Sequence, residues 1–251
     1  MKLQGGLAAP VMTRLVFHSE PDRKRWQERI RMIQNDWLRV ERQSVLEGIR
    51  DCVIQTFKPV EYLKIQAWAH RNGLFATILQ TAKSFEGFAS RYEPGEELLV
   101  TAVTRLAEMG DKPEEHLGYP KCCQEAFESR WPLVPDPIWQ WAGGPENGKV
   151  VSGGHLVTTR MLPTTNPLLR YLSVRFCPHI PCEALCQETV EFSTKLRSLM
   201  GKEFQDPAEE LLSMPVSWDC YRGIAIVKIA PLRIVIGSTV TAVRYIVEAT
   251  L

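Results

Sequence analysis

Apolar and arginine-rich positions alternate with a helical period over the first part of the chain. Between residues 19 and 57 apolar residues recur every three or four positions, and arginines are frequent on the opposite face. The apolar positions are Trp26, Ile30, Ile33, Trp37, Val40, Val45, Ile49 and Val53. Ser19, Pro21 and Asp22 suit the start of a helix. The pattern predicts one long amphipathic helix, or two in series, whose arginine-rich face is solvated.

The rest of the chain mixes helical and strand patterns. Further helices are predicted over residues 58–73, 104–110, 111–118, 121–131, 182–201 and 206–215. Strands are predicted over residues 74–81 and 97–103, and two more in the Ile- and Val-rich segment that begins at Gly223, meeting near Ala230 and Pro231. In the helix of residues 206–215, Asp206 is expected as N-cap and Pro207 as the first helical residue. The order predicts an α+β fold with a helical N-terminal part, a mixed α/β region and a C-terminal β segment.

Length and charge restrict the classes of protein to which the chain can belong. Its 251 residues suit a helical region at 1–90 and a second domain at 91–251, or one continuous globular unit. A formal net charge of +1 argues against a general nucleic-acid binder. The longest apolar runs are interrupted by charged residues or proline, and the N-terminus lacks a continuous apolar signal segment. We therefore expect a cytoplasmic protein without a membrane partner, which acts on a small molecule.

Five of the seven cysteines fall in two short segments, "GYPKCC" at residues 118–123 and "RFCPHIPCEALC" at residues 175–186. In a reducing compartment, clustered cysteines are typical of metal ligands or catalytic thiols. Pro120 and Pro181 each suit the start of a predicted helix, where the helix dipole favours thiolates. The i, i+4 spacing of Cys182 and Cys186 would place both thiols on one helical face. The sequence predicts a metal site between two helix N-termini.

The expected ligands are Cys123, Cys182 and Cys186, with Cys122 as the alternative to Cys123, because adjacent cysteines rarely both bind one iron. Thiolates, nearby N–H groups and a proline favour an iron–sulfur cluster, most simply [4Fe–4S]. Zinc is the alternative. Cys177 is a neighbour of the site and not an expected ligand.

Three function hypotheses follow from this ligand set. The first is an iron–sulfur lyase or transferase of biosynthesis, in which three ligands leave one iron open for Lewis-acid chemistry or sulfur transfer. His179 would then be the general acid–base residue or a fourth ligand, and Arg170 or Arg175 would hold a substrate carboxylate or phosphate. The second is a binding module stapled by structural zinc or by a cluster. The third is a transferase with a cysteine nucleophile and His179 as its base.

Three segments, "HLGYPKCCQEAF", "NPLLRYLSVRFCPHIPCEALC" and "LLSMPVSWDCYRGIAIVKIAPLRI", resemble an uncharacterised family, domain of unknown function 483. That family's pattern is Gly-Tyr-Pro-x-Cys-Cys, then His-x-Pro-Cys-x-x-x-Cys, then Met-Pro-x-x-Trp, and the resemblance spans roughly residues 95–238. It implies a matching set of Gly118, Tyr119, Pro120, Cys122, Cys123, His179, Pro181, Cys182, Cys186 and Trp218. The family has no established activity to transfer, so the resemblance supports the cysteine motifs and adds no reaction.

Overall fold

The computed structural model divides the chain into two compact units, Met1–Trp37 with Pro120–Leu251, and Leu38–Tyr119. It describes residues 11–17, 19–57, 59–78, 96–102, 113–130, 149–151, 156–159, 162–167, 169, 173–213, 216–219, 224–229 and 232–238. The predicted boundary between residues 90 and 91 lies outside these ranges and stays a prediction. Helices accompany antiparallel sheets in the described residues, so the α+β class is confirmed.

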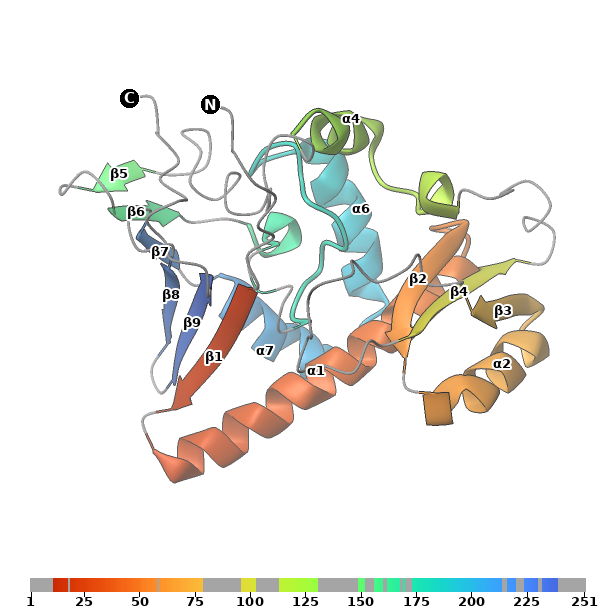
Figure 1. The fold of residues 1–251 in the computed structure, drawn as a ribbon, viewed down its shortest axis with the longest axis horizontal. Coiled ribbons are helices and arrows are strands. Elements are labelled where there is room, and N and C mark those ends of the chain that lie inside the picture. The colour runs from red at the N-terminus through yellow and green to blue at the C-terminus, as the bar shows by residue number, and fades with distance from the viewer. Residues whose placement is uncertain are drawn as a thin grey trace, which may run out of the picture. The chain divides into compact units, whose positions relative to one another are not determined.

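The first unit contains a six-stranded antiparallel sheet in the order β1-β9-β8-β7-β6-β5. Its strands are β1 (Val11–Phe17), β5 (Lys149–Val151), β6 (Leu156–Thr159), β7 (Val216–Asp219), β8 (Ile224–Ile229) and β9 (Leu232–Ser238). β8 and β9 pair antiparallel from Ile224↔Gly237 to Ile229↔Leu232, so the two strands predicted for this segment are confirmed, while Ala230 and Pro231 between them lie outside the described residues. β1 pairs with β9, which places the first strand of the chain beside its last (Figure 1).

Among the described residues, four helices contribute to the first unit. They are α1 (Glu20–Leu46, up to Trp37), α4 (Lys121–Arg130), α6 (Gln187–Ser198) and α7 (Lys202–Leu212). Within this unit the predicted apolar face of α1 is buried: Trp26, Ile30, Ile33 and Trp37 are each at most 3% exposed. Apolar burial at this spacing is what holds an amphipathic helix in a fold.

Helix α7 begins earlier than its sequence suggests. Asp206 was expected as N-cap, but the N-cap is Gly201, and Pro207 lies inside the helix. The Gly201 carbonyl accepts hydrogen bonds from the N–H groups of Phe204 and Gln205, which close the first turn. The Gly201 N–H in turn donates to Asp36 Oδ2 at 3.0 Å. A contact distant in sequence therefore sets this start, and the helix accommodates a proline that lacks one backbone donor.

The second unit, Leu38–Tyr119, is built on a three-stranded antiparallel sheet in the order β2-β4-β3. Its elements are the end of α1, β2 (Cys52–Phe57), α2 (Tyr62–Arg71), β3 (Leu74–Ile78) and β4 (Glu96–Ala102). Val45, Val53, Phe57, Ala69, Leu74, Ala76 and Val100 form its apolar core. The predictions of helix α2 and of strands β3 and β4 are confirmed.

The prediction that helix continues to Phe57 is wrong beyond Leu46. The chain turns at Gly48, whose φ of +67° is a conformation that glycine adopts without strain, and residues 52–57 form β2. β2 pairs with β4 from Cys52↔Thr101 to Phe57↔Glu96. A short apolar run suits a buried strand as well as a helix, and a partner strand more than forty residues away decides between them.

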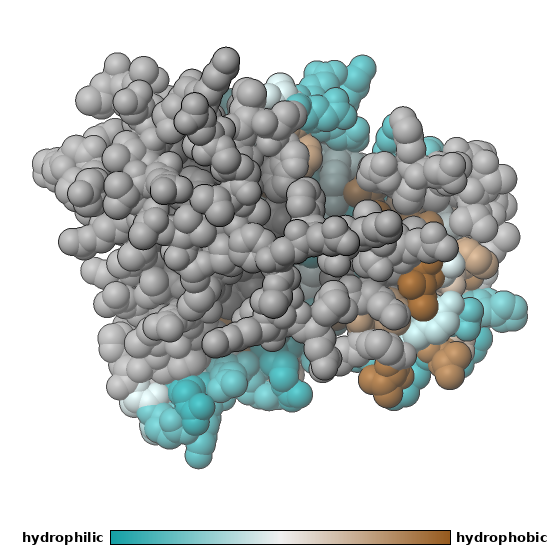
Figure 2. All heavy atoms as spheres, in the orientation of Figure 1, coloured by the Kyte–Doolittle hydropathy of each residue, from teal (hydrophilic) through white to brown (hydrophobic). Residues whose placement is uncertain are grey.

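Apolar side chains also lie on the surface of the second unit. Val60, Leu63 and Ile78 are 79%, 72% and 40% exposed. Figure 2 shows brown, apolar surface in the region of α2 and β3. Among the described helices none is both long and apolar enough to cross a membrane.

Candidate metal centre

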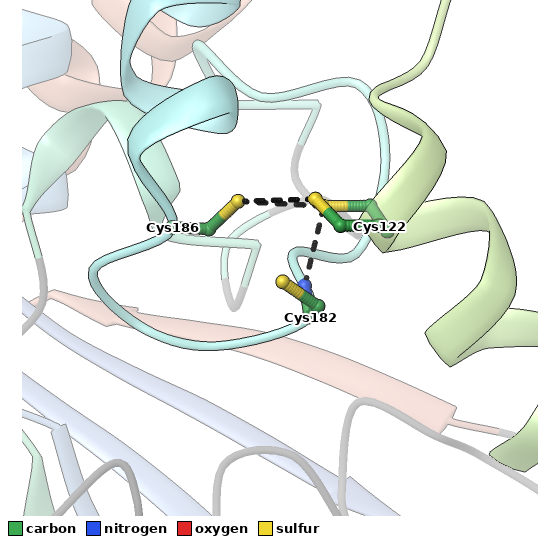
Figure 3. Close-up of side chains that lie close together, drawn as sticks. Cys122, Cys182 and Cys186 are labelled. Atoms are coloured by element: carbon green, nitrogen blue, oxygen red, sulfur yellow. Dashed lines mark hydrogen bonds between the residues drawn. The ribbon is translucent and has the colours of Figure 1, made fainter.

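Four cysteine sulfurs from two distant segments converge within the first unit. The Sγ atoms of Cys122, Cys123, Cys182 and Cys186 all lie within 4.8 Å of one another. The separation is 3.8 Å for Cys122 and Cys123, and 3.7 Å from each of these to Cys186. Figure 3 shows the side chains of Cys122, on α4, and Cys186, at the start of α6, directed toward each other, with Cys182 on the loop beside them. The convergence of these two segments, expected from sequence, is therefore present.

Helix α4 supplies two of the sulfurs from its first turn. The Pro120 carbonyl accepts hydrogen bonds from the N–H groups of Cys123 and Gln124, at 2.9 and 3.0 Å, so the helix starts where the proline suggested. Gly118, two residues before, has a φ of +71° that lets the chain turn into the helix. Cys123 is 2% exposed, and Cys122 is half-buried.

The other two sulfurs come from a segment that is not helical, which corrects the predicted helix of residues 182–201. Helix α6 begins at Gln187, and Cys186 is its N-cap. Prolines at positions 178 and 181 disfavour helix at the residues just before them, 177 and 180. Beyond the prolines, the Ala184 carbonyl accepts a hydrogen bond from the Thr165 hydroxyl at 2.6 Å, a contact from outside this segment. Cys182 and Cys186 therefore do not share a helical face, and a folded loop brings their sulfurs together.

The loop is well anchored although it has no regular structure. Val174, Phe176 and Cys177 are at most 1% exposed, and Ile180 is 9% exposed. Because these side chains are packed in the interior, the backbone just before Cys182 has little freedom, and this limits where the following cysteines can lie. The close approach of the four sulfurs thus depends on side-chain packing as well as on local backbone preference.

Two hydrogen-bonding groups lie beside the Cys123 sulfur. The backbone N–H of Cys182 donates to Cys123 Sγ at 3.3 Å, and Thr189 Oγ1 lies 3.2 Å from the same sulfur. N–H and O–H donors stabilise a thiolate more than a thiol. Thr189, fully buried in α6, is a residue that sequence reasoning missed, and its position three residues after the Cys186 N-cap is the signal that could have revealed it.

The four thiols differ in how readily they ionise. Burial raises the pKa of Cys122, Cys123 and Cys182 to about 12. Burial acts in the same direction on Cys186, but interactions with Thr189, Cys182 and Cys122 outweigh it and lower the pKa of that thiol. A cation is therefore required for all four to be thiolates together near neutral pH.

The other predicted site residues lie in different surroundings. His179 is buried, and its Nε2 lies 3.0 Å from Thr189 Oγ1. The Arg175 guanidinium lies over the Trp37 ring at 5.7 Å. Cys177 Sγ donates to the His179 carbonyl at 3.0 Å and is not one of the four clustered sulfurs. Arg170 is outside the described residues. The proposed roles of His179, Arg170 and Arg175 in chemistry stay predictions.

Comparisons with protein-family models, with curated proteins and with solved structures find no match. The interpretation of the cluster therefore depends on its own geometry and chemistry. Four cysteines with sulfurs this close could bind a metal ion.

Proposed function

We propose that the four cysteines bind one zinc ion, and that this ion staples helix α4 to the loop before helix α6. The spacing of the sulfurs carries the proposal. A tetrahedral zinc ion with Zn–S bonds of about 2.3 Å separates its sulfur ligands by about 3.8 Å. The three pairs formed by Cys122, Cys123 and Cys186 are separated by 3.7 to 3.8 Å.

The same spacing disfavours a four-iron cluster, the first hypothesis from sequence. In such a cluster each thiolate binds a different iron, so the width of the cluster keeps the thiolates apart. Here adjacent Cys122 and Cys123 both face Cys186 at the distance expected for ligands of a single ion. Among single ions held by four thiolates in a tetrahedron, zinc is the common one.

A site closed by four protein ligands has a structural role. Catalytic zinc sites keep a position open for water or substrate, whereas structural sites fill all four with protein. Zinc here would organise an irregular loop whose position no helix or strand otherwise determines. The function that the geometry supports best is therefore a zinc-stapled binding module. The iron–sulfur enzyme with an open iron, and the resemblance to domain of unknown function 483, stay predictions.

The metal content of the protein tests this proposal. Protein purified without oxygen is expected to be colourless and to contain one zinc per chain by elemental analysis, with no acid-labile sulfide. Brown protein with iron and labile sulfide would contradict the proposal and support the iron–sulfur hypothesis. Colourless, metal-free protein with one rapidly alkylated cysteine would instead support the cysteine nucleophile.

Zinc affinity is expected to rise steeply with pH. In the metal-free site the pKa values of three thiols are raised to about 12, so at pH 7 these thiols are protonated, and zinc must displace their protons. Displacement of these three protons, together with any still held by Cys186, makes the affinity rise at least about a thousandfold per pH unit, and fall by the same factor as pH decreases. Competition titrations with a chelator between pH 6 and 8, corrected for the chelator's own protonation, measure the slope. Release of fewer than two protons would show that the thiolates form before the metal binds.

A further inference from the structure

A buried chain of polar groups extends from the metal centre to His179. Thr189 Oγ1 lies 3.2 Å from Cys123 Sγ and 3.0 Å from His179 Nε2. Thr189 is fully buried, Cys123 is 2% exposed, and His179 is 8% exposed. Little solvent reaches these groups, so the hydrogen bonds within the chain determine which atoms carry protons.

The donor and the acceptor of each hydrogen bond in this series of polar groups follow from counting hydrogens. A zinc-bound thiolate has lone pairs and no hydrogen, so it can only accept. Thr189 interacts with the thiolates of both Cys123 and Cys186, and neither can donate, so its single hydroxyl hydrogen must point to these sulfurs, with Cys123 Sγ at 3.2 Å, and Thr189 Oγ1 is left as an acceptor toward His179. Nε2 of His179 must therefore carry a hydrogen.

The surroundings of His179 suit the tautomer with hydrogen on Nε2. In a neutral imidazole protonated at Nε2, Nδ1 is an acceptor. Cys177 Sγ lies 3.7 Å from Nδ1 and 3.0 Å from the His179 carbonyl oxygen, so its thiol hydrogen faces two acceptors. Burial raises the pKa of Cys177 to about 12, which keeps that hydrogen in place. The Phe192 ring packs at 5.8 Å between centroids and restricts the orientation of the imidazole.

We propose that His179 is a positioning residue for the metal centre, acting through a one-way relay in which His179 Nε2–H donates to Thr189 and the Thr189 hydroxyl donates to the Cys123 thiolate. The inference rests on the proposed zinc site, because only a thiolate at Cys123 sets the direction. It assigns to His179 a role other than acid–base catalysis. The relay holds Cys123 in its orientation as a ligand and withdraws electron density from its sulfur.

Two matched pairs of variants test the relay. His179→Leu removes the donor, while His179→Gln retains an amide N–H at the place of Nε2. Thr189→Val removes the hydroxyl at nearly constant shape, while Thr189→Ser retains it. We expect His179→Leu and Thr189→Val to weaken zinc binding by about 10- to 100-fold, the range typical of groups that orient metal ligands. The Gln and Ser variants should stay within about threefold of the unaltered protein, on the same scale of effects.

Two further readouts separate the relay from a loss of packing. In the cobalt-substituted protein, Thr189→Val should shift the sulfur-to-cobalt charge-transfer band, and Thr189→Ser should not. The double variant His179→Leu/Thr189→Val should bind zinc no more weakly than Thr189→Val alone, because both break one chain. Additive losses, or equal losses in the Leu and Gln variants, would overturn the relay.

The tautomer can be observed without any substitution. Nitrogen-15 spectra of the zinc-loaded protein are expected to show His179 neutral with its hydrogen on Nε2. Hydrogen on Nδ1 alone would overturn the relay while leaving the zinc site intact. Absence of zinc binding by the unaltered protein would instead refute the proposed function, and the relay with it.

Discussion

Replacing Cys123 with serine is expected to abolish stoichiometric zinc binding and to lower the melting temperature by about 10 °C or more, since a loss of several kcal/mol shifts Tm by a few degrees per kcal/mol in a chain of this size. Cys123 is buried, its sulfur accepts a hydrogen bond from the Cys182 N–H, and Thr189 Oγ1 lies 3.2 Å from it. A serine hydroxyl does not supply the soft thiolate that the proposed zinc ion would need. Because metal binding is coupled to folding, loss of the ion removes its contribution to stability. Elemental analysis and thermal unfolding of the same samples measure both effects.

Two further substitutions separate loss of the ion from damage to the core. Cys182 is half-buried, so Cys182→Ser should remove a ligand with little loss of packing and should still release zinc. Cys177→Ser changes a fully buried thiol in the same loop that is not one of the four. It should retain one zinc per chain even if burial of the hydroxyl lowers stability. Full zinc content in Cys123→Ser, or its loss in Cys177→Ser, would show that the ligand set is different.

The second large effect is expected at Phe176, which anchors the loop before the cysteines. Its side chain is fully buried, and the Arg197 guanidinium lies 5.5 Å from its ring centre. Truncation to alanine leaves a cavity beside α6, and such changes typically cost about 3–5 kcal/mol. In urea unfolding of the zinc-loaded protein, this loss should lower the midpoint urea concentration, while the dependence of the free energy of unfolding on urea (the m-value) stays unchanged.

Phe127 provides the matched control for this prediction. It is also a phenylalanine of the first unit, on α4, but it is 40% exposed. Phe127→Ala should therefore cost much less than Phe176→Ala, about 1 kcal/mol or below. Equal costs for the two substitutions would mean that Phe176 does not anchor the loop.

Local patterns were sufficient for the buried face of α1 and for the start of α4, although not for the start of α7. The spacing of Trp26, Ile30, Ile33 and Trp37 predicted the buried face of α1, because burial on a helix follows its period. Pro120 predicted the start of α4, because the first N–H groups of a helix have no partner within it, and a residue without an N–H is tolerated there. The same reasoning failed at residues 52–57, where the pairing of β2 with β4 determines the structure.

The identity of the candidate ligands also followed from sequence, while their arrangement did not. Sulfur is a soft ligand whatever its surroundings, so two cysteine-rich segments predicted a metal site without knowledge of the fold. A helical face was the wrong explanation for Cys182 and Cys186, because α6 begins only after Cys186 and the Ala184 carbonyl between them accepts a hydrogen bond from Thr165, which a local pattern does not show.

Residue chemistry and short-range periodicity are properties of the chain, and they were enough for the α+β class, the main helices and the cysteine cluster. The separations of 3.7 to 3.8 Å, on which we base the proposal of a single ion, and the buried path from Cys123 through Thr189 to His179 belong to the tertiary structure. Such distances arise where segments about sixty residues apart pack together, and no local preference encodes them.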